Sequence, residues 1–414
     1  MTCSAGLGIV IIGAGISGLT TALALHRLGL RADVYERNAV ITDAGAGVAI
    51  GPNAAYVLEK LGLEDKLDEV SCRNRGGINI VFREHVDSAV RFVGRLNTER
   101  RSFYCHRAKL VHIIACELPQ DQIHLGKTLV DVTEGDTSVT AHFHDGTSAT
   151  CHVLIGADGI KSFARSLWNQ ENAVFSGQVA VRSIIEAEAL PPKLHDCLHH
   201  GQIWLAPGKR HMVAFPIEKA KLVAIAAIVP AWPGHEWRES WAIRGDVRLQ
   251  DRLESVDPLL RDLFKYSERQ IVSGLYERTP LSTWIHGRTV LVGDAAHAML
   301  PHQGQGGSQA IEDAIILSLT LAAAAASPPI ELAPWLRTYQ AARKPRADEA
   351  AKASRVTGEA FDKLLFCEEG MRFLQSAYAW INTNDLFGDL ANAVEREFGA
   401  SERADLMQSL MSRF

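Results

Sequence analysis

The chain has 414 residues, of which 47% are hydrophobic and 22% are charged, and its formal net charge at pH 7 is −5. A chain of this length and ordinary composition is expected to form two or three globular domains. The negative net charge and the lack of a long basic run argue against nucleic-acid binding. The seven cysteines are scattered and never spaced C-x-x-C, which favours reduced thiols in a cytoplasmic protein over disulfides or a zinc site.

Two apolar stretches resemble membrane spans only superficially. Leu7–Leu25 contains four glycines and divides into a β-branched run and an Ala/Leu run, which predicts a strand, a turn and a helix. Ala314–Ala326 has 13 residues, too few to cross a bilayer, and predicts a buried helix. Met1–Gly6 carries no Lys or Arg, unlike the start of a secretory signal. We therefore expect no membrane span.

Hydrophobic periodicity predicts strands and helices that alternate at first, then a run of strands, and then mostly helices. A helix at 308–326 is expected after a short strand, with Pro334 and Pro345 as breaks in the helices that follow. In chain order the earlier predictions are a strand at 7–12, a helix at 19–28, a strand at 31–36, a glycine-rich loop at 44–51, helices at 52–61 and 107–118, hairpins at 76–93 and 130–154, strands at 176–188, 202–207, 210–216 and 221–230, a helix at 248–264 and a strand at 289–292.

The first chemical motif is G-x-G-x-x-G at Gly13, Gly15 and Gly18. It lies between an apolar strand and a helix, and the next strand ends at Glu36. In such a βαβ unit the glycines let the backbone approach a pyrophosphate at the helix N-terminus, and the carboxylate accepts ribose hydroxyls. The context predicts a dinucleotide site, and the alternative is a tight structural turn.

Two further strand ends carry an acid and glycines. The segment 156–159 reads Gly-Ala-Asp-Gly and is followed by Ser162 and Arg165; by itself it is compatible with a simple Asp-Gly turn. The segment 293–308 reads GDAAHAMLPHQGQGGS. There, Asp294 can hold a sugar hydroxyl, and backbone N–H groups at 306–308 can hold partial negative charge on a ring carbonyl.

These three motifs, in this order and spacing, resemble those of the single-component FAD-dependent aromatic hydroxylases, particularly the salicylate-hydroxylase-like members. The resemblance covers about residues 7 to 350. It implies an α/β fold, with a Rossmann-like FAD-binding domain, an inserted β-sheet substrate domain and C-terminal helices that pack outside or support a dimer. The expected boundaries are 1–73, 100–172 and 275–345 for the FAD-binding domain, 74–99 and 173–274 for the substrate domain, and 346–414 for the C-terminal helices.

The resemblance also implies the cofactor contacts. Asp158 belongs to the motif linked to both FAD and NAD(P)H, and Asp294 binds the ribityl side. The remaining expected contacts are Gly13, Gly15 and Gly18 at the pyrophosphate, Glu36 at the adenosine ribose with Arg37 beside it, Ala49 near the flavin, Arg107 along the FAD chain, and Gly306, Gly307 and Ser308 along the isoalloxazine.

The chemistry that this resemblance implies needs little redox work from side chains. NADH or NADPH reduces FAD, the reduced flavin traps O₂ as a C4a-hydroperoxide, and the distal oxygen attacks an electron-rich ring. The protein supplies orientation, a dry cavity and help with substrate deprotonation. The expected partners are a small phenolic or aromatic acid, such as salicylate, and O₂.

Three residues are candidates for direct work on the substrate. Pro301 is expected beside it, next to the reactive flavin edge. Arg182 matches a substrate-site arginine of some fungal members and could hold a phenolate or carboxylate, or could simply pair with an acid. His302 could polarise or deprotonate a ring hydroxyl, or could be a loop histidine bonded to backbone.

One residue departs from the family pattern. Phe215 stands where relatives often have a tyrosine that touches the substrate, so it is expected as an apolar pocket wall or as core. Trp204 is a further candidate for an aromatic wall, although core tryptophans are common. His211 is expected to be structural. The histidines around Cys197 are expected in a solvated loop, without a metal.

Several alternatives stay open. Epoxidation or oxidative dearomatisation of a polyketide or alkaloid would keep the cofactor and change the chemistry. A flavin halogenase is disfavoured because no W-x-W-x-I-P element occurs. Prenyl-protein escort proteins use a similar fold as a binding module, but the complete flavin segment at 293–308 argues against that reading. The chain is compatible with a monomer or a homodimer.

Overall fold

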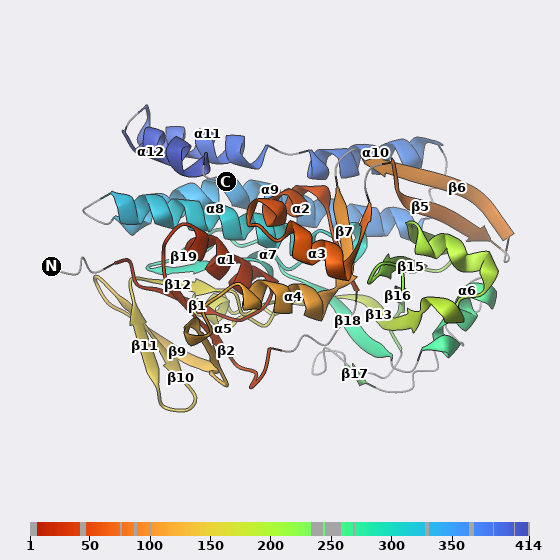
Figure 1. Ribbon diagram of the computed structural model, residues 1–414, viewed down its shortest axis with the longest axis horizontal. Coiled ribbons are helices and arrows are strands. Elements are labelled where there is room, and N and C mark those ends of the chain that lie inside the picture. Colours follow the sequence, from red (N-terminus) through yellow and green to blue (C-terminus); the bar gives the residue numbers. More distant parts are fainter. Residues whose placement is uncertain are drawn as a thin grey trace.

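The computed structural model shows a mixed α/β protein organised around two large sheets (Figure 1). Two long helices run side by side through the middle of the molecule, and further C-terminal helices lie along one side of them (Figure 1). The structure describes residues 6–41, 47–74, 77–86, 89–98, 101–232, 243–244, 258–267, 270–327, 331–363, 368–383, 385–400 and 402–412.

The first large sheet has six strands in the order β19-β20-β12-β1-β2-β8, and all its neighbours are parallel except β19 and β20. Because β1, β12 and β20 are adjacent and parallel, the three glycine motifs that follow them meet at one edge of the sheet. The bounds are β1 Ile9–Ile12, β2 Ala32–Glu36, β8 Ile123–Leu125, β12 Val153–Gly156, β19 Ile285–His286 and β20 Thr289–Leu291.

The second large sheet has eight strands in the order β17-β18-β13-β16-β15-β14-β5-β6. It is antiparallel apart from the β14–β5 pair, and it joins two segments that lie far apart in the sequence. The bounds are β5 Gly77–Val86, β6 Ala89–Thr98, β13 Val174–Glu186, β14 Gly201–Ala206, β15 Arg210–Ile217, β16 Leu222–Pro230, β17 Ile243–Arg244 and β18 Ile271–Glu277.

Two three-stranded sheets complete the strands. One has the order β3-β7-β4. The other is the meander β9-β10-β11, at the lower left of Figure 1. The bounds are β3 Gly47–Ile50, β4 Ser71–Asn74, β7 Ser102–His106, β9 Leu129–Glu134, β10 Val139–Phe143 and β11 Ser148–Cys151.

The helices cover the six-stranded sheet and then extend towards the eight-stranded one. Helix α8 is buried along most of its length and packs against α1, α2 and α9. The bounds are α1 Ile16–Arg27, α2 Pro52–Lys60, α3 Glu64–Val70, α4 Arg107–Cys116, α5 Phe163–Ser166, α6 Pro258–Asp262, α7 Asp294–His297, α8 Gly306–Ala326, α9 Leu332–Asp362, α10 Glu368–Asn382, α11 Leu386–Phe398 and α12 Glu402–Met411.

Helix α8 spans Gly306–Ala326, which confirms the helix predicted at 308–326 and adds two residues at its start. With 21 residues it is long and apolar enough to cross a membrane, but 89% of its apolar window is buried inside the protein. Here α8 serves as the central core helix.

Other predicted elements differ from the structure. The predicted break at Pro345 is wrong, because α9, which has 31 residues in all, continues through this proline. Proline removes one intrahelical hydrogen bond, and the burial of α9 against α8 outweighs that loss. The predicted loop at 44–51 contains strand β3. Residues 248–257 of the predicted helix at 248–264 lie outside the described residues, and α6 covers 258–262.

Candidate active site

A single cavity of about 860 Å³ connects the motif edge of the six-stranded sheet with one face of the eight-stranded sheet. Its lining includes Gly13 and Glu36 at one end and Arg182 and His302 at the other. A cavity that runs from a βαβ glycine loop onto a second sheet can hold an extended dinucleotide with a smaller ligand at its far end.

The three glycines of the first motif have different roles. Gly15 lines the cavity, and a Cβ there would meet nothing within 4 Å, so the backbone borders open space. Gly13 has a φ of +107°, which favours glycine, and it also lines the cavity. Gly18 does not line it; a Cβ there would overlap the carbonyl oxygen of Gly13. The third glycine therefore serves close packing of α1 on the loop.

Glu36 is tied to the same glycine loop. Its carboxylate accepts hydrogen bonds from the backbone N–H of Ala14 at 2.8 Å and of Asn38 at 2.9 Å. Both Glu36 and the exposed Arg37 line the cavity. The carboxylate is thus fixed at the end of β2, where the remaining lone pairs of its oxygens can accept ribose hydroxyls.

Asp158 holds the second motif together. Its buried carboxylate accepts hydrogen bonds from the Ser162 hydroxyl and from the backbone N–H groups of Phe163 at 2.7 Å and Ala164 at 3.1 Å. Burial raises the pKa of Asp158, although these hydrogen bonds oppose the rise. The carboxylate therefore organises the start of α5, and the residue also lines the cavity.

The second and third motifs are joined by Arg165. This arginine is 1% exposed and donates to the carbonyls of Ala296 at 3.0 Å and Thr279 at 2.8 Å. Burial lowers its pKa to about 10, with a further contribution from the nearby Arg278. The cation thus fixes α7, which begins with Asp294, against the loop that follows β12.

The third motif presents backbone to the cavity. Gly306 and Gly307 line it, and a Cβ on either would approach nothing closer than 3.8 Å. Asp294 and Pro301 line the same part, and the Asp294 side chain is exposed. Because Gly306 begins a 21-residue helix, its N–H groups and the helix dipole favour partial negative charge at this point.

Ser308 lies one step away from the cavity. It is fully buried, and its hydroxyl accepts a hydrogen bond from the backbone N–H of Gly51 at 3.1 Å. It does not line the cavity, unlike the two glycines before it. The residue therefore ties α8 to the segment between β3 and α2, and it borders the site indirectly.

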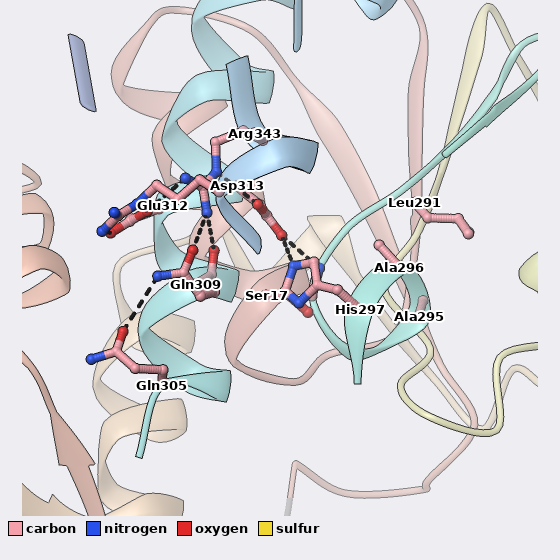
Figure 2. Close-up of polar contacts among 12 residues, drawn as sticks. Ser17, Leu291, Ala295, Ala296, His297, Gln305, Gln309, Glu312, Asp313 and Arg343 are labelled. Atoms are coloured by element: carbon pink, nitrogen blue, oxygen red, sulfur yellow. Dashed lines mark hydrogen bonds and ion pairs between the residues drawn. The ribbon is translucent and has the colours of Figure 1, made fainter. Parts of the chain in front are cut away.

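Behind the third motif lies a buried network of charges that the sequence did not suggest. Figure 2 shows Arg343 of α9 between Glu312 and Asp313 of α8, with His297 on the other side of Asp313. Arg343 donates to Glu312 at 2.6 Å and to Asp313 at 2.9 Å. Asp313 also accepts from the N–H of Gly293 at 2.9 Å. The network therefore fixes the turn that carries Asp294.

His297 belongs to this network rather than to the cavity. Its Nε2 lies 2.6 Å from the Asp313 carboxylate. Burial disfavours the imidazolium, but the Asp313 carboxylate outweighs this and raises the pKa of His297. The same contact helps to hold the pKa of Asp313 below its usual value despite burial.

The eight-stranded sheet forms the floor of the far end of the cavity. On β15 the lining residues are His211, Val213 and Phe215, spaced two apart on one face. Arg182 on β13 lies on the same face, and Ala226 on β16 lies between the two strands. The polar groups of this floor are the Arg182 guanidinium, the His211 imidazole and the amide of Gln202 on β14.

Arg182 reaches the cavity from the middle of β13. Its guanidinium donates to the Ser273 hydroxyl, and no carboxylate pairs with it among the described residues. Burial lowers its pKa to about 10, and Arg107, which also lines the cavity, lowers it further. A cation without a carboxylate partner in an apolar site favours an anionic ligand.

His302 and His211 meet at the same end. Their ring centroids lie 5.3 Å apart, and both imidazoles are more than 90% buried. The Nδ1 atoms of both rings have no hydrogen-bond partner within the described part of the chain. Burial lowers the pKa of His302 to about 4; burial and His302 together hold the pKa of His211 well below its usual value. Both rings are therefore neutral bases at neutral pH.

Three aromatic residues at this end of the cavity were not among the predicted site residues. Tyr104 on β7 packs against Phe215 with ring centroids 5.2 Å apart, and Phe361 and Tyr378 enter from α9 and α10. The C-terminal helices are therefore part of the site and do not only cover the outside. Only strand alternation could have revealed His211, because it precedes Phe215 by four residues on one strand.

Trp204 does not line the cavity, which corrects the expectation of an aromatic wall there. It is 4% exposed and packs in the core on the opposite face of the eight-stranded sheet, with Met212 and Leu194. Its neighbour Ile203 faces the cavity instead. Successive residues of a strand point to opposite faces, so only one of the two can reach the site.

The remaining expected contacts lie along the cavity. Ala49 on β3 and Arg107 at the start of α4 line its middle part, between the glycine loops and the sheet floor. The residues fit FAD on two observations. The glycine loops leave space beside Gly15 and Gly307, and acids that line the cavity stand at the ends of three strands of the six-stranded sheet, namely Glu36 at β2, Asp158 after β12 and Asp294 after β20. A pyrophosphate, ribose hydroxyls and a ring carbonyl each find matching groups.

Comparison with known proteins agrees with this fit. The model of the FAD binding domain family matches residues 7–354. The 3-amino-4-hydroxybenzoate 2-monooxygenase PtmB3 of Streptomyces platensis is 33% identical, over 85% of this chain and 88% of its own. A salicylate hydroxylase of Pseudomonas putida is 31% identical, over 94% and 95%. A solved salicylate hydroxylase–substrate complex, 28% identical, has a TM-score of 0.78 over 94% of this chain and 98% of its own. The chain belongs to the FAD binding domain family and is an FAD-dependent aromatic-ring monooxygenase of the salicylate hydroxylase type.

Proposed function

We propose that this enzyme hydroxylates a small aromatic acid that carries a ring hydroxyl or amino group, with salicylate as the reference compound and NADH or NADPH as the reductant. The observation that carries the proposal is the combination, in one apolar cavity end, of the Arg182 guanidinium with the neutral imidazoles of His211 and His302. A cation suits a carboxylate, and a neutral imidazole suits the proton of a phenol.

The dimensions of the floor support a ligand of this size. Arg182 on β13 and His211 on β15 are separated by one intervening strand, β16, so their strands lie about 10 Å apart at the usual strand spacing. Both side chains line the same cavity. With its carboxylate at Arg182, the ring of an aromatic acid would extend towards the histidines.

The residues at the other end would hold FAD. Gly13, Gly15 and Glu36 would bind the pyrophosphate and adenosine ribose, and Asp294 and the N–H groups at 306–307 would bind the ribityl chain and the ring carbonyl. Bound FAD would supply electron transfer from the nicotinamide and activation of O₂. The chain itself positions the ring, keeps water out and handles the proton.

Proton handling falls to His302 and His211. The unprotonated nitrogen of either ring can accept the proton of a ring hydroxyl, which makes the ring more electron-rich and so more reactive towards an electrophilic oxygen. Val213, Phe215 and Ala226 surround this end with apolar groups and limit access of water. Pro301 begins the turn that carries His302 and sets the position of that imidazole.

The test is oxidation of NADH and of NADPH by the purified yellow protein, with and without salicylate, with the products identified by mass. We expect salicylate to increase the rate at which one of the two reductants is consumed. The product should have gained one oxygen, either with the carboxylate kept or with loss of CO₂ to give a catechol. A flavoprotein that binds no hydroxybenzoate or aminobenzoate and forms no product from them would refute the proposal. That result would favour epoxidation or dearomatisation of a larger substrate.

A further inference from the structure

Helix α10 contributes a side chain to the cavity from beyond the part of the chain that the family model matches. That match ends at residue 354, whereas Tyr378 lies in α10 and lines the cavity. Phe361, near the end of α9, also lies outside the match and packs edge-on against His211 at 5.2 Å. This wall therefore lies outside the residues that the family model matches.

Tyr378 brings a hydroxyl to the end of the site that holds His302. The neighbouring floor residue Phe215 has none, and the Tyr104 ring packs on Phe215. Burial raises the pKa of Tyr104, and the nearby Tyr378 raises it further. Burial likewise raises the pKa of Tyr378, so its hydroxyl stays protonated at neutral pH.

The hydroxyl of Tyr378 makes one long hydrogen bond, to the loop that carries His302. It donates to the backbone carbonyl of His302, at an oxygen–oxygen distance of 3.5 Å. A phenol has one proton and can accept through its oxygen lone pairs, so a hydroxyl whose proton is directed at a carbonyl offers the cavity an acceptor. A ligand group that donates a hydrogen bond fits this oxygen, and a group that only accepts does not.

The helix that carries Tyr378 is fixed at both ends. Near its start, Met371 packs against β6 at Gly94, where a Cβ would overlap the Met371 sulfur. Near its end, the carbonyl of Ile381 accepts from Arg346 Nη2 at 2.6 Å, and Arg346 also donates from Nε to Glu312 at 2.8 Å. Arg346 therefore links the last turn of α10 to α8.

We propose that Tyr378 is a specificity-determining residue whose oxygen accepts a hydrogen bond from a ring hydroxyl or amino group of the substrate. The enzyme then selects aromatic acids that carry a donor over acids of the same shape that lack one. Because Arg346 and Met371 hold α10 in place before the ligand arrives, this selection requires no rearrangement of the helix. This inference rests on the proposed function and names the substituent that the site recognises.

The test compares ligand binding to the FAD-loaded enzyme. The probes are the three hydroxybenzoates and the three matching fluorobenzoates, which keep the carboxylate and the shape but lack a donor. Dissociation constants come from the change in flavin absorbance. For the hydroxybenzoate that binds best, the ratio of its affinity to that of its fluoro analogue is the measure of selection.

Tyr378→Phe is expected to lower this ratio by about 2- to 10-fold, the range of one hydrogen bond, with little change in the affinity of the fluorobenzoate. The control is Tyr266→Phe, because Tyr266 is 46% exposed and does not line the cavity; its ratio should match the wild type. Phe is a close shape match for Tyr, so a loss of packing alone would weaken both ligands equally.

The two ways to fail are distinct. If hydroxybenzoates bind and are oxidised, but Tyr378→Phe leaves the ratio unchanged or weakens both ligands equally, the inference is wrong and the proposed function stands. If the wild-type enzyme binds none of the six acids and no aminobenzoate, the proposed function is wrong and this inference fails with it.

Discussion

His211 and His302 face each other at the substrate end of the cavity with ring centroids 5.3 Å apart, although they come from a strand and a loop separated by about ninety residues of sequence. Phe361 packs against both rings, at 5.2 Å and 6.3 Å. Burial keeps both imidazoles neutral, so each can act as a base. Arg182 lines the same cavity and pairs with no carboxylate among the described residues, so the cavity also holds a cation.

The histidine pair predicts how stability depends on pH. In the folded state the pKa of His302 is about 4, below its ordinary value, so the unfolded chain takes up the proton first as pH falls. The free energy of unfolding should therefore decrease as pH falls from about 6.5 towards 4, by up to about 1.4 kcal/mol per pH unit for this residue.

Urea unfolding of wild type and His302→Asn at several pH values measures this effect. The variant should show a shallower loss of stability over that window, whereas His144→Asn, at an exposed histidine, should follow the wild type. Equal pH slopes for wild type and His302→Asn would mean that His302 is not held neutral by burial.

The glycine loop predicts two different effects from two similar substitutions. Gly15→Ala adds a methyl group into open space at the cavity and should weaken FAD binding at least tenfold, while the apoprotein keeps its stability. Gly18→Ala places a methyl group against the carbonyl of Gly13 and should destabilise the fold itself. FAD titration and thermal unfolding of both apoproteins separate these effects, and identical behaviour of the two variants would refute the assignment.

Asp294 and Arg182 should separate cofactor binding from substrate binding. Asp294→Ala should lose FAD on gel filtration, because its exposed carboxylate is placed to hold the ribityl chain. Asp136→Ala, at an exposed acid distant from the lining, is the control and should keep FAD. Stoichiometric FAD in purified Asp294→Ala protein would contradict the site.

Arg182→Gln should keep its FAD and raise KM for the aromatic acid by about 10- to 100-fold, because it removes a hydrogen bond to a charged group. Arg182→Lys keeps the charge without the planar fork, so it should recover part of the loss. Steady-state kinetics with a saturating nicotinamide measure this. A KM unchanged in Arg182→Gln would show that the carboxylate binds elsewhere.

The buried network predicts a large loss of stability on truncation. Arg343→Met leaves Glu312 and Asp313 with fewer partners inside the protein and should cost about 3–5 kcal/mol. The matched control, Arg337→Met, breaks an ion pair with Glu397 at the surface and should cost less than about 1 kcal/mol. Chemical unfolding of both variants decides this, and similar losses would contradict a structural role for the network.

The parts of the site that local sequence determines could be predicted. Gly13 and Gly15, Asp294, and Gly306 and Gly307 follow buried strands, and parallel strands bring their carboxyl ends to one edge. Glycines and acids at strand ends carry a local signal that needs no knowledge of distant contacts.

The parts that depend on long-range packing could not. Tyr378 reaches the cavity only because α10 folds back over the eight-stranded sheet. Trp204 was misplaced because the sequence of a single strand does not show which of its faces meets the cavity. Pro345 was misread because the local cost of proline was weighed without the burial of α9. His211 carried a strand-alternation signal, but its burial beside His302 appears only in the folded chain.

We propose that this cavity inserts one oxygen atom from O₂ into an aromatic acid. The most direct measurement is turnover of salicylate with the preferred nicotinamide under ¹⁸O₂, followed by mass analysis of the product. We expect one ¹⁸O atom per product molecule. Product without the label, or consumption of the nicotinamide that yields only hydrogen peroxide with every hydroxybenzoate, would contradict it.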